Sequence, residues 1–232
     1  LTKEYIGTID VLDATWFGFT EINFWDKQTG RRLSYRSLIP RRKIIPFNLD
    51  KGQCESFKKK RYFRIKWNHE ENKFSFVFNI QGDSVRPFGQ GTFMGSLAGE
   101  KNCEITSVLP APVMRRCVAV YQNVIPVTCG ISTSSLVASI TPQNSNGLAF
   151  FSLRHAFYKL RTKSSELVAM GKVKDKDIVI RLYTSTQDPT DTLTYNENFL
   201  YVDGIPTPLP PVRITQPHGI MGMWVIQDTE SM

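Results

Sequence analysis

The sequence predicts an all-β protein built from antiparallel strands. Apolar and polar residues alternate over runs of strand length, which is typical of strands with one buried face. Glycine, proline and aspartate interrupt these runs at fairly even spacing, as they do in β-sandwiches and β-barrels. No segment keeps a 3.6-residue periodicity over a typical helix length, and the one weak helix candidate is His155–Lys163.

The first half of the chain contains five predicted strands. A turn at Lys27–Arg31 includes Gly30, which can adopt a positive φ, and Asn68–Asn72 forms a polar turn. Pro40 and Pro46 predict an edge or a loop between the third strand and the fourth. The predicted strands are Glu4–Leu12, Phe17–Asp26, Arg32–Leu38, Arg61–Trp67 and Lys73–Gln81.

The last two of these strands form a hairpin with an aromatic face. Alternation places Phe74, Phe76, Phe78 and Ile80 on one side of the second strand. A second aromatic run comprises Trp16, Phe17, Phe19, Phe24 and Trp25. We expect both groups to form ordinary hydrophobic core, with the lining of an apolar pocket as the alternative.

A glycine-rich stretch, Arg86–Lys101, lies in the middle of the chain. No Gly-Lys-Ser/Thr follows it, so it is not a phosphate-binding loop, and we expect bends and close backbone approach. Turns are predicted at Lys174–Asp177 and Asp203–Gly204, and Thr207–Pro211 is too proline-rich for a central strand. The strands predicted here are Glu104–Leu109, Cys117–Tyr121, Ser135–Thr141, Leu148–Leu153, Glu166–Val173, Ile178–Thr184 and Phe199–Val202.

The length of 232 residues and the hydrophobic fraction of 41% predict a folded protein with a sizeable core. We expect two packed β units, residues 1–103 and 104–232. No apolar run approaches the roughly 18 residues that a transmembrane helix needs. The chain begins at Leu1 without a secretory leader, so we expect the translated start to lie upstream.

The four cysteines are Cys54, Cys103, Cys117 and Cys129. None forms a CxxC pair, and no histidine lies near enough to Cys117 and Cys129 to complete a zinc site. We expect free thiols in a reducing compartment, the cytoplasm, with a disulfide as the alternative.

Positive charge is concentrated between Lys27 and Lys66. This window holds 14 Lys and Arg against Asp50 and Glu55, a net +12, whereas the rest of the chain has a net −4. A solvated face is one explanation, but charges this close repel each other unless a counter-charge is supplied, so we expect an anionic partner. The predicted partner-binding residues are Arg31, Arg32, Arg36, Arg41, Arg42, Lys43, Lys58, Lys59, Lys60, Arg61 and Arg64.

No constellation of residues predicts catalysis. The chain lacks Gly-x-Ser-x-Gly, HExxH and Walker patterns. The histidines His69, His155 and His218 have no partner at metal or triad spacing, and we expect no cofactor and no metal. The carboxylates Asp188, Asp191, Glu197 and Asp203 could form an acid–base pair, but turn capping is the expected role of the aspartates.

The order of motifs along the chain resembles an uncharacterised family, DUF2804. The resemblance covers most of the chain, and its most specific part is Asn196-Glu197-Asn198 followed by Val202-Asp203-Gly204. The other matching motifs are the strand pair Tyr5–Leu12 and Gly18–Trp25, the turn Asp26–Arg31, Val108-Leu109-Pro110, Arg115-Arg116, Ile125-Pro126, Gly130, Leu209 and Val212-Arg213.

The resemblance implies a lipocalin-like architecture related to the two-barrel carotenoid hydratase and survival-factor proteins, with an apolar ligand. It also implies a ligand pocket that includes Arg161, Glu197 and Asn198. The chain departs from the family pattern after Arg161, where tryptophans are absent, and at Ala149–Phe151, where apolar residues replace an acidic one. A lysine expected near Tyr121-Gln122 is also missing. These departures predict a scaffold that has lost an ancestral site.

We therefore expect a non-enzymatic structural or interaction protein. It would dock through residues 27–66 on an acidic partner, such as a cytoskeletal polymer, in the cytoplasm. The alternatives are a lipocalin-like binder, or cryptic enzyme, of an apolar small molecule, and a nucleic-acid-binding protein. An anionic membrane surface is a further alternative, although the sequence has no amphipathic helix or lipidation signal.

Overall fold

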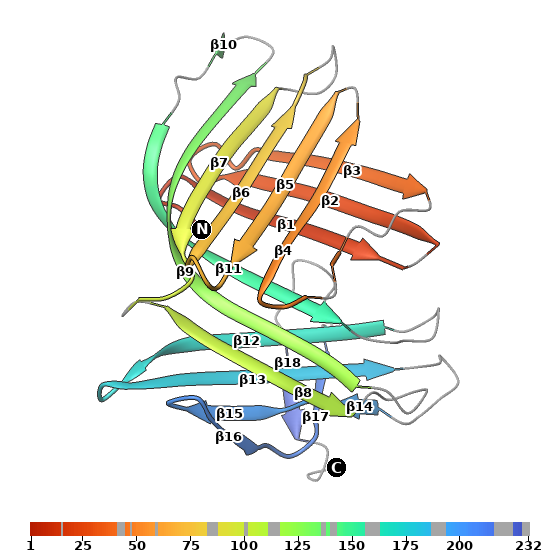
Figure 1. Ribbon diagram of the computed structural model, residues 1–232, viewed down its shortest axis with the longest axis vertical. Coiled ribbons are helices and arrows are strands. Elements are labelled where there is room, and N and C mark those ends of the chain that lie inside the picture. The colour runs from red at the N-terminus through yellow and green to blue at the C-terminus, as the bar shows by residue number, and fades with distance from the viewer. Residues whose placement is uncertain are drawn as a thin grey trace. The chain divides into compact units, whose positions relative to one another are not determined.

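The structure is a computed structural model, and it confirms the all-β prediction. Every regular element it describes is a β-strand, and the paired strands of known register are antiparallel (Figure 1). The helix candidate falls mostly on residues 156–162, outside the described residues. The described residues are 1–14, 16–40, 45–46, 48–58, 60–82, 88–99, 102–110, 117–135, 138–139, 143–155, 163–186, 194–215 and 225–228.

The chain divides into two compact units, but not into the two contiguous segments that we expected. Unit 1 comprises residues 1–102 and 123–151, and unit 2 comprises residues 103–122 and 152–232. The segment 123–151 belongs to unit 1 because the second half of strand β9 is hydrogen-bonded along strand β7, from Gly95↔Val127 to Gly89↔Thr133. Long-range strand pairing, which local patterns do not reveal, therefore decides the division.

Unit 1 contains a three-stranded sheet in the order β1-β2-β3. Its strands are β1 (Tyr5–Asp13), β2 (Phe17–Asp26) and β3 (Arg32–Pro40). Gly30 has a φ of +66° in the turn between β2 and β3, as predicted for this position. One face of β2 is buried through Ile22 and Phe24, whereas β3 has no partner strand on its second side among the described residues.

A second, curled sheet has the strand order β10-β9-β7-β6-β5-β4, and β8 and β11 also pair with β9 (Figure 1). The strand β4 was not expected from the sequence. The eight strands are β4 (Lys51–Lys58), β5 (Arg61–Asn68), β6 (Lys73–Ile80), β7 (Gly89–Ser96), β8 (Cys103–Pro110), β9 (Cys117–Ser135), β10 (Ala138–Ser139) and β11 (Gln143–His155).

The core of unit 1 is aromatic, as the hairpin pattern predicted. Phe74, Phe76, Phe78 and Ile80 are all buried, and the rings of Phe24 and Phe78 stack with their centroids 4.9 Å apart. This stacking joins the inner face of β2 to the inner face of β6. The sheet β1-β2-β3 and the curled sheet therefore form a sandwich.

Within the described residues, most of the glycine-rich stretch forms strand β7, and the predicted bends follow it at residues 97–99. The predicted close backbone approach also occurs. Gly91 lies opposite Phe78, and a Cβ at position 91 would lie only 2.3 Å from Phe78 Cε1. Likewise, a Cβ at position 95 would lie 2.5 Å from the carbonyl oxygen of Pro126. Gly91 is therefore needed so that the inner face can hold the ring of Phe78, and Gly95 lets β7 approach the backbone of β9 at Pro126.

Unit 2 has a sheet in the order β12-β13-β15-β16, with β14 on β13, and a separate hairpin of β17 and β18. Ile105, Val179 and Tyr201 form a buried core cluster. The predicted turns include residues of positive φ, namely Lys174, Asp175, Asp203 and Gly204. The strands are β12 (Lys163–Val173), β13 (Lys176–Thr186), β14 (Thr194–Asn196), β15 (Phe199–Val202), β16 (Ile205–Pro208), β17 (Val212–Thr215) and β18 (Val225–Asp228).

Candidate functional site

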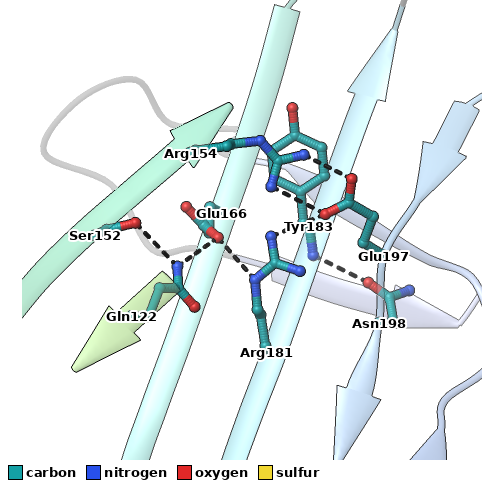
Figure 2. A network of polar contacts seen from close by, with 8 residues as sticks. All are labelled: Gln122, Ser152, Arg154, Glu166, Arg181, Tyr183, Glu197 and Asn198. Carbon is teal, nitrogen blue, oxygen red and sulfur yellow. Dashed lines mark hydrogen bonds and ion pairs between the residues drawn. The ribbon is translucent and has the colours of Figure 1, made fainter. Parts of the chain in front are cut away.

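A network of charged and polar side chains lies inside unit 2, and its centre is Arg181 on β13 (Figure 2). The side chain of Arg181 is 0% exposed. Its Nε donates a hydrogen bond to Glu166 Oε1 at 3.0 Å, and its Nη2 donates to Glu197 Oε2 at 2.9 Å. A buried guanidinium needs such partners, because removing a charge from water costs several kcal/mol in real proteins.

Glu197 is held by a second arginine as well. Arg154, on β11, donates from Nη1 to Oε2 at 2.9 Å and from Nη2 to Oε1 at 2.6 Å. The guanidinium carbon of Arg154 lies 4.0 Å from the centre of the Tyr183 ring, a cation–π geometry that fixes the arginine (Figure 2). Burial opposes ionisation of Glu197, but the hydrogen bonds and charges of Arg154 and Arg181 outweigh it and lower the pKa of this carboxyl.

Gln122 and Asn198 complete the network. Gln122, on β9, donates from Nε2 to Glu166 Oε1 at 3.0 Å and to Ser152 Oγ at 3.2 Å. Asn198 Oδ1 accepts the backbone N–H of Tyr183 at 3.0 Å, so this side chain ties β13 to the segment before β15. Gln122 Oε1 and Arg181 Nη1 are buried and have no hydrogen-bond partner in the described part of the chain.

The predicted ligand pocket corresponds only partly to this network. Glu197 and Asn198 are buried, at 2% and 5% exposure. However, Asn198 forms a hydrogen bond with the backbone, and Glu197 forms salt bridges with two arginines. Arg161 lies outside the described residues. Sequence reasoning missed Arg154, Glu166 and Arg181. A signal was present, because Arg181 alternates with Val179 and Tyr183 on the buried face of a strand, where a charged residue requires a partner.

The network favours a structural role over acid–base chemistry. A general acid at neutral pH needs a carboxyl group of raised pKa, whereas two arginines lower the pKa of Glu197. Glu166 is also ion-paired, to Arg181. Both carboxylates are therefore occupied as counter-ions of the arginines.

We predict a specific acid sensitivity of unit 2. The pKa of Glu197 in the folded protein lies below its value in the unfolded chain, about 4.3. Its ionisation therefore contributes stability above that pH, and this contribution is lost as the pH falls through the folded-state pKa. In urea unfolding at a series of pH values, Glu197→Gln should be less stable than the unaltered protein at pH 7. The difference should shrink towards pH 2, and a constant difference would contradict the prediction.

The basic residues predicted to bind a partner lie in unit 1. Arg31, Arg32, Arg36, Lys58 and Lys60 are exposed, and Arg61 and Arg64 are half-buried. Arg41, Arg42, Lys43 and Lys59 lie outside the described residues. We call the set Arg31, Arg32, Arg36, Lys58, Lys60 and Arg61 the basic surface; Arg64 projects from another face, on β5.

Two hydrogen bonds join the β4–β5 hairpin to strand β3. Lys58 Nζ donates to the carbonyl oxygen of Leu38 at 2.7 Å, and Arg61 Nη1 donates to that of Arg36 at 2.6 Å. The carbonyl groups on the second side of β3 thus obtain donors although no strand pairs with them there. Because a carbonyl carries no net charge, Lys58 and Arg61 keep their positive charge at this edge.

Glu21 is the acidic residue that pairs with the basic surface in the described residues. Its Oε1 lies 3.0 Å from Arg36 Nε and 3.7 Å from Arg32 Nη2. A hydrogen bond from Asn23, followed by the contacts with the two arginines, lowers the pKa of Glu21. The remaining cations form no salt bridge within the described part of the chain.

The described residues offer little for metal binding or nucleophilic catalysis. No group of His, Cys, Asp and Glu within them could hold a metal ion. Cys54 and Cys103 are free thiols, and burial raises the pKa of Cys54 to about 12. Asp203 is a turn residue as predicted, accepting the Asp177 N–H at 2.9 Å. Asp188, Asp191 and His218 lie outside the described residues.

No family model, curated protein or solved structure matches this chain. The resemblance to DUF2804 therefore stays a prediction. Within the described residues, no helix has the length and apolar character that crossing a membrane requires.

Proposed function

We propose that the protein is a non-enzymatic interaction protein whose unit 1 docks on an acidic partner through the basic surface. The observation that carries this proposal is the joining of the β4–β5 hairpin to strand β3 by Lys58 and Arg61. These bonds gather cations from two parts of the sequence into one surface. Within the described residues, only Arg32 and Arg36 have an acidic partner there, and they share Glu21.

The charge distribution supports the same proposal. Residues 27–66 carry a net +12, and the described acidic residues do not neutralise it. Self-repulsion of this kind destabilises a compact state, and an anionic partner relieves it while also accelerating association. A repeating acidic surface, such as a cytoskeletal polymer in the cytoplasm, is one partner that this proposal includes.

The packing of unit 1 disfavours an apolar ligand between its two sheets. Phe76, Phe78 and Phe93 stack on one another, with centroid distances of 5.5 to 6.5 Å. A cavity lined by Ile22, Tyr35 and other residues of both sheets has a volume of about 20 Å³. That is close to the space for one water molecule, far below the 300–1,000 Å³, roughly, of a small-molecule site. DUF2804 membership remains a proposal that rests on motif order.

Removing charge from the basic surface should weaken binding. We predict that Arg31→Gln/Lys58→Gln/Lys60→Gln lowers retention of the protein on immobilised poly-L-aspartate, oligonucleotide and phosphatidylserine vesicles. Retention should also fall with increasing salt, because contacts between exposed charges are screened. The matched control is Lys3→Gln/Lys176→Gln/Arg213→Gln, which removes the same number of exposed cations elsewhere. If the unaltered protein binds none of the three polyanions at physiological salt, or if both variants bind equally well, the proposal is wrong.

A further inference from the structure

Strand register places an ordered set of side chains on the outer face of the curled sheet. The buried phenylalanines occupy the inner face, so the alternate residues of β4, β5, β6, β7 and β9 point outward. One row across these strands reads Phe57, Tyr62, Asn79, Gln90 and Ser132. The row therefore changes from aromatic to amide to hydroxyl side chains. It crosses four strand spacings of about 4.8 Å, or about 19 Å in total.

The aromatic end of this row is open to solvent and flanked by cations. Phe57 is 72% exposed, and its ring meets that of Tyr62 edge-to-face at 6.3 Å between centroids. Arg64, two residues further along β5, places its guanidinium carbon 5.9 Å from the centre of the Tyr62 ring. Lys66 follows on the same face and is exposed. Arg64 Nε is buried without a hydrogen-bond partner in the described residues.

The amide end of the row borders an open hollow over β6, β7 and β9. Its volume is about 750 Å³, and its lining includes Asn79, Gln90, Thr92, Ser132 and Asn146. These side chains offer both hydrogen-bond donors and acceptors. Met94, 58% exposed, adds an apolar contact at the same place.

We infer that this outer face binds single-stranded nucleic acid, with Phe57 as a stacking platform. The inference goes beyond the proposed function, because Phe57, Arg64 and Lys66 lie outside the basic surface. An acidic protein surface would engage the cations but has no need of an exposed phenylalanine beside amide-lined space. A single strand engages all three features: phosphates bind Arg64 and Lys66, a base stacks on Phe57, and base edges meet the hollow.

The charge near this face suits a phosphate backbone. Lys60 lies in the turn that follows Phe57, and Arg64 and Lys66 continue along β5. Glu55, which lies opposite Arg64, accepts a hydrogen bond from Gln53 at 2.8 Å and forms no salt bridge with the arginine within the described residues. The charge of the Arg64 guanidinium is therefore not neutralised by Glu55, and it can bind a phosphate group. Sites that bind single strands of any sequence usually combine an aromatic ring, on which a base stacks, with a cation nearby.

Fluorescence anisotropy with the full chain tests the inference. The probes are fluorescein-labelled dT20 and U20, which distinguish DNA from RNA, and a hairpin duplex of equal length. We expect both single strands to bind, and Phe57→Ala to weaken binding roughly five- to 150-fold without changing the salt slope. Lys66→Gln should instead reduce the slope of log K against log salt by about 0.7. The control Leu12→Ala removes an exposed apolar side chain from β1 and should change nothing.

The outcomes separate this inference from the proposed function. Equal affinity of Phe57→Ala and the unaltered protein for both strands overturns the inference, as does tighter binding of the duplex. If poly-L-aspartate binds in a charge-dependent manner and the oligonucleotides do not, the partner is an acidic protein surface, and the proposed function alone stands. If neither class binds, the inference is wrong, and if phosphatidylserine vesicles also fail to bind, the proposed function is wrong as well.

Discussion

Replacing Arg181 with methionine is expected to lower the free energy of unfolding of unit 2 by about 3–5 kcal/mol. The methionine retains apolar volume but removes the charge that Glu166 and Glu197 share. Arg154 then becomes the remaining cation for Glu197, and Glu166 loses its salt bridge within the described network. Urea unfolding gives the total loss. Hydrogen exchange of the backbone amides of β13 assigns it to unit 2.

Two comparisons make this prediction specific. Arg154→Met should cost less than Arg181→Met, because the side chain of Arg154 is 17% exposed and Glu197 would retain Arg181. Arg213→Met, at an exposed position of β17, should change the free energy of unfolding by no more than about 0.5 kcal/mol. A loss below about 1 kcal/mol for Arg181→Met would contradict the prediction. It would show that the cost of removing Arg181 from water nearly cancels the attraction between its charge and the two carboxylates.

The fold class was predictable because its signals are local. The alternation at Lys73–Ile80 identified both the strand and its buried side, and Gly30 identified the turn between β2 and β3. Strand β4 was missed because its sequence, Lys51–Lys58, is half-exposed and charged at its end. Strand β7 was missed because its glycines, read alone, predict bends. Their role depends on the large rings of β6 opposite them, which are distant in sequence.

The candidate sites were predictable to different extents. The clustering of charge between Lys27 and Lys66 is visible in composition, but the bonds from Lys58 and Arg61 to the carbonyls of β3 depend on how two sheets meet. In unit 2, Glu197 stood out through a motif, whereas its partners Arg154 and Arg181 lie on two strands, β11 and β13. A buried ion pair between distant strands leaves no spacing pattern in a single sequence.

The division of charge between the units explains why they are expected to behave differently. In unit 2, the carboxylates of Glu166 and Glu197 are each paired with an arginine, so these charges stabilise the fold. In unit 1, the cations lie at strand edges and hairpin turns, where folding supplies few counter-ions. Charge that does not stabilise the fold is available for a partner. The two sets of arginines therefore have different roles despite their shared chemistry.

Gly91→Val and Phe78→Ala are expected to be strongly destabilising alone and to compensate each other when combined. Phe78 is 2% exposed and stacks on Phe24, so its removal should cost about 3–5 kcal/mol through the cavity it leaves. A valine at position 91 places its Cβ 2.3 Å from Phe78 Cε1 and forces the ring to move, which should cost at least about 1–3 kcal/mol.

In the double variant, the valine occupies part of the space that the ring has left. Its free energy of unfolding should therefore exceed the value expected from adding the two single losses, by about 1 kcal/mol or more. Gly171→Val is the matched control: it is also a strand glycine, but no atom lies within 4 Å of its added Cβ. It should be neutral or slightly stabilising, since glycine weakens a strand. Strict additivity in urea unfolding would show that the contact between Gly91 and Phe78 does not limit the packing of unit 1.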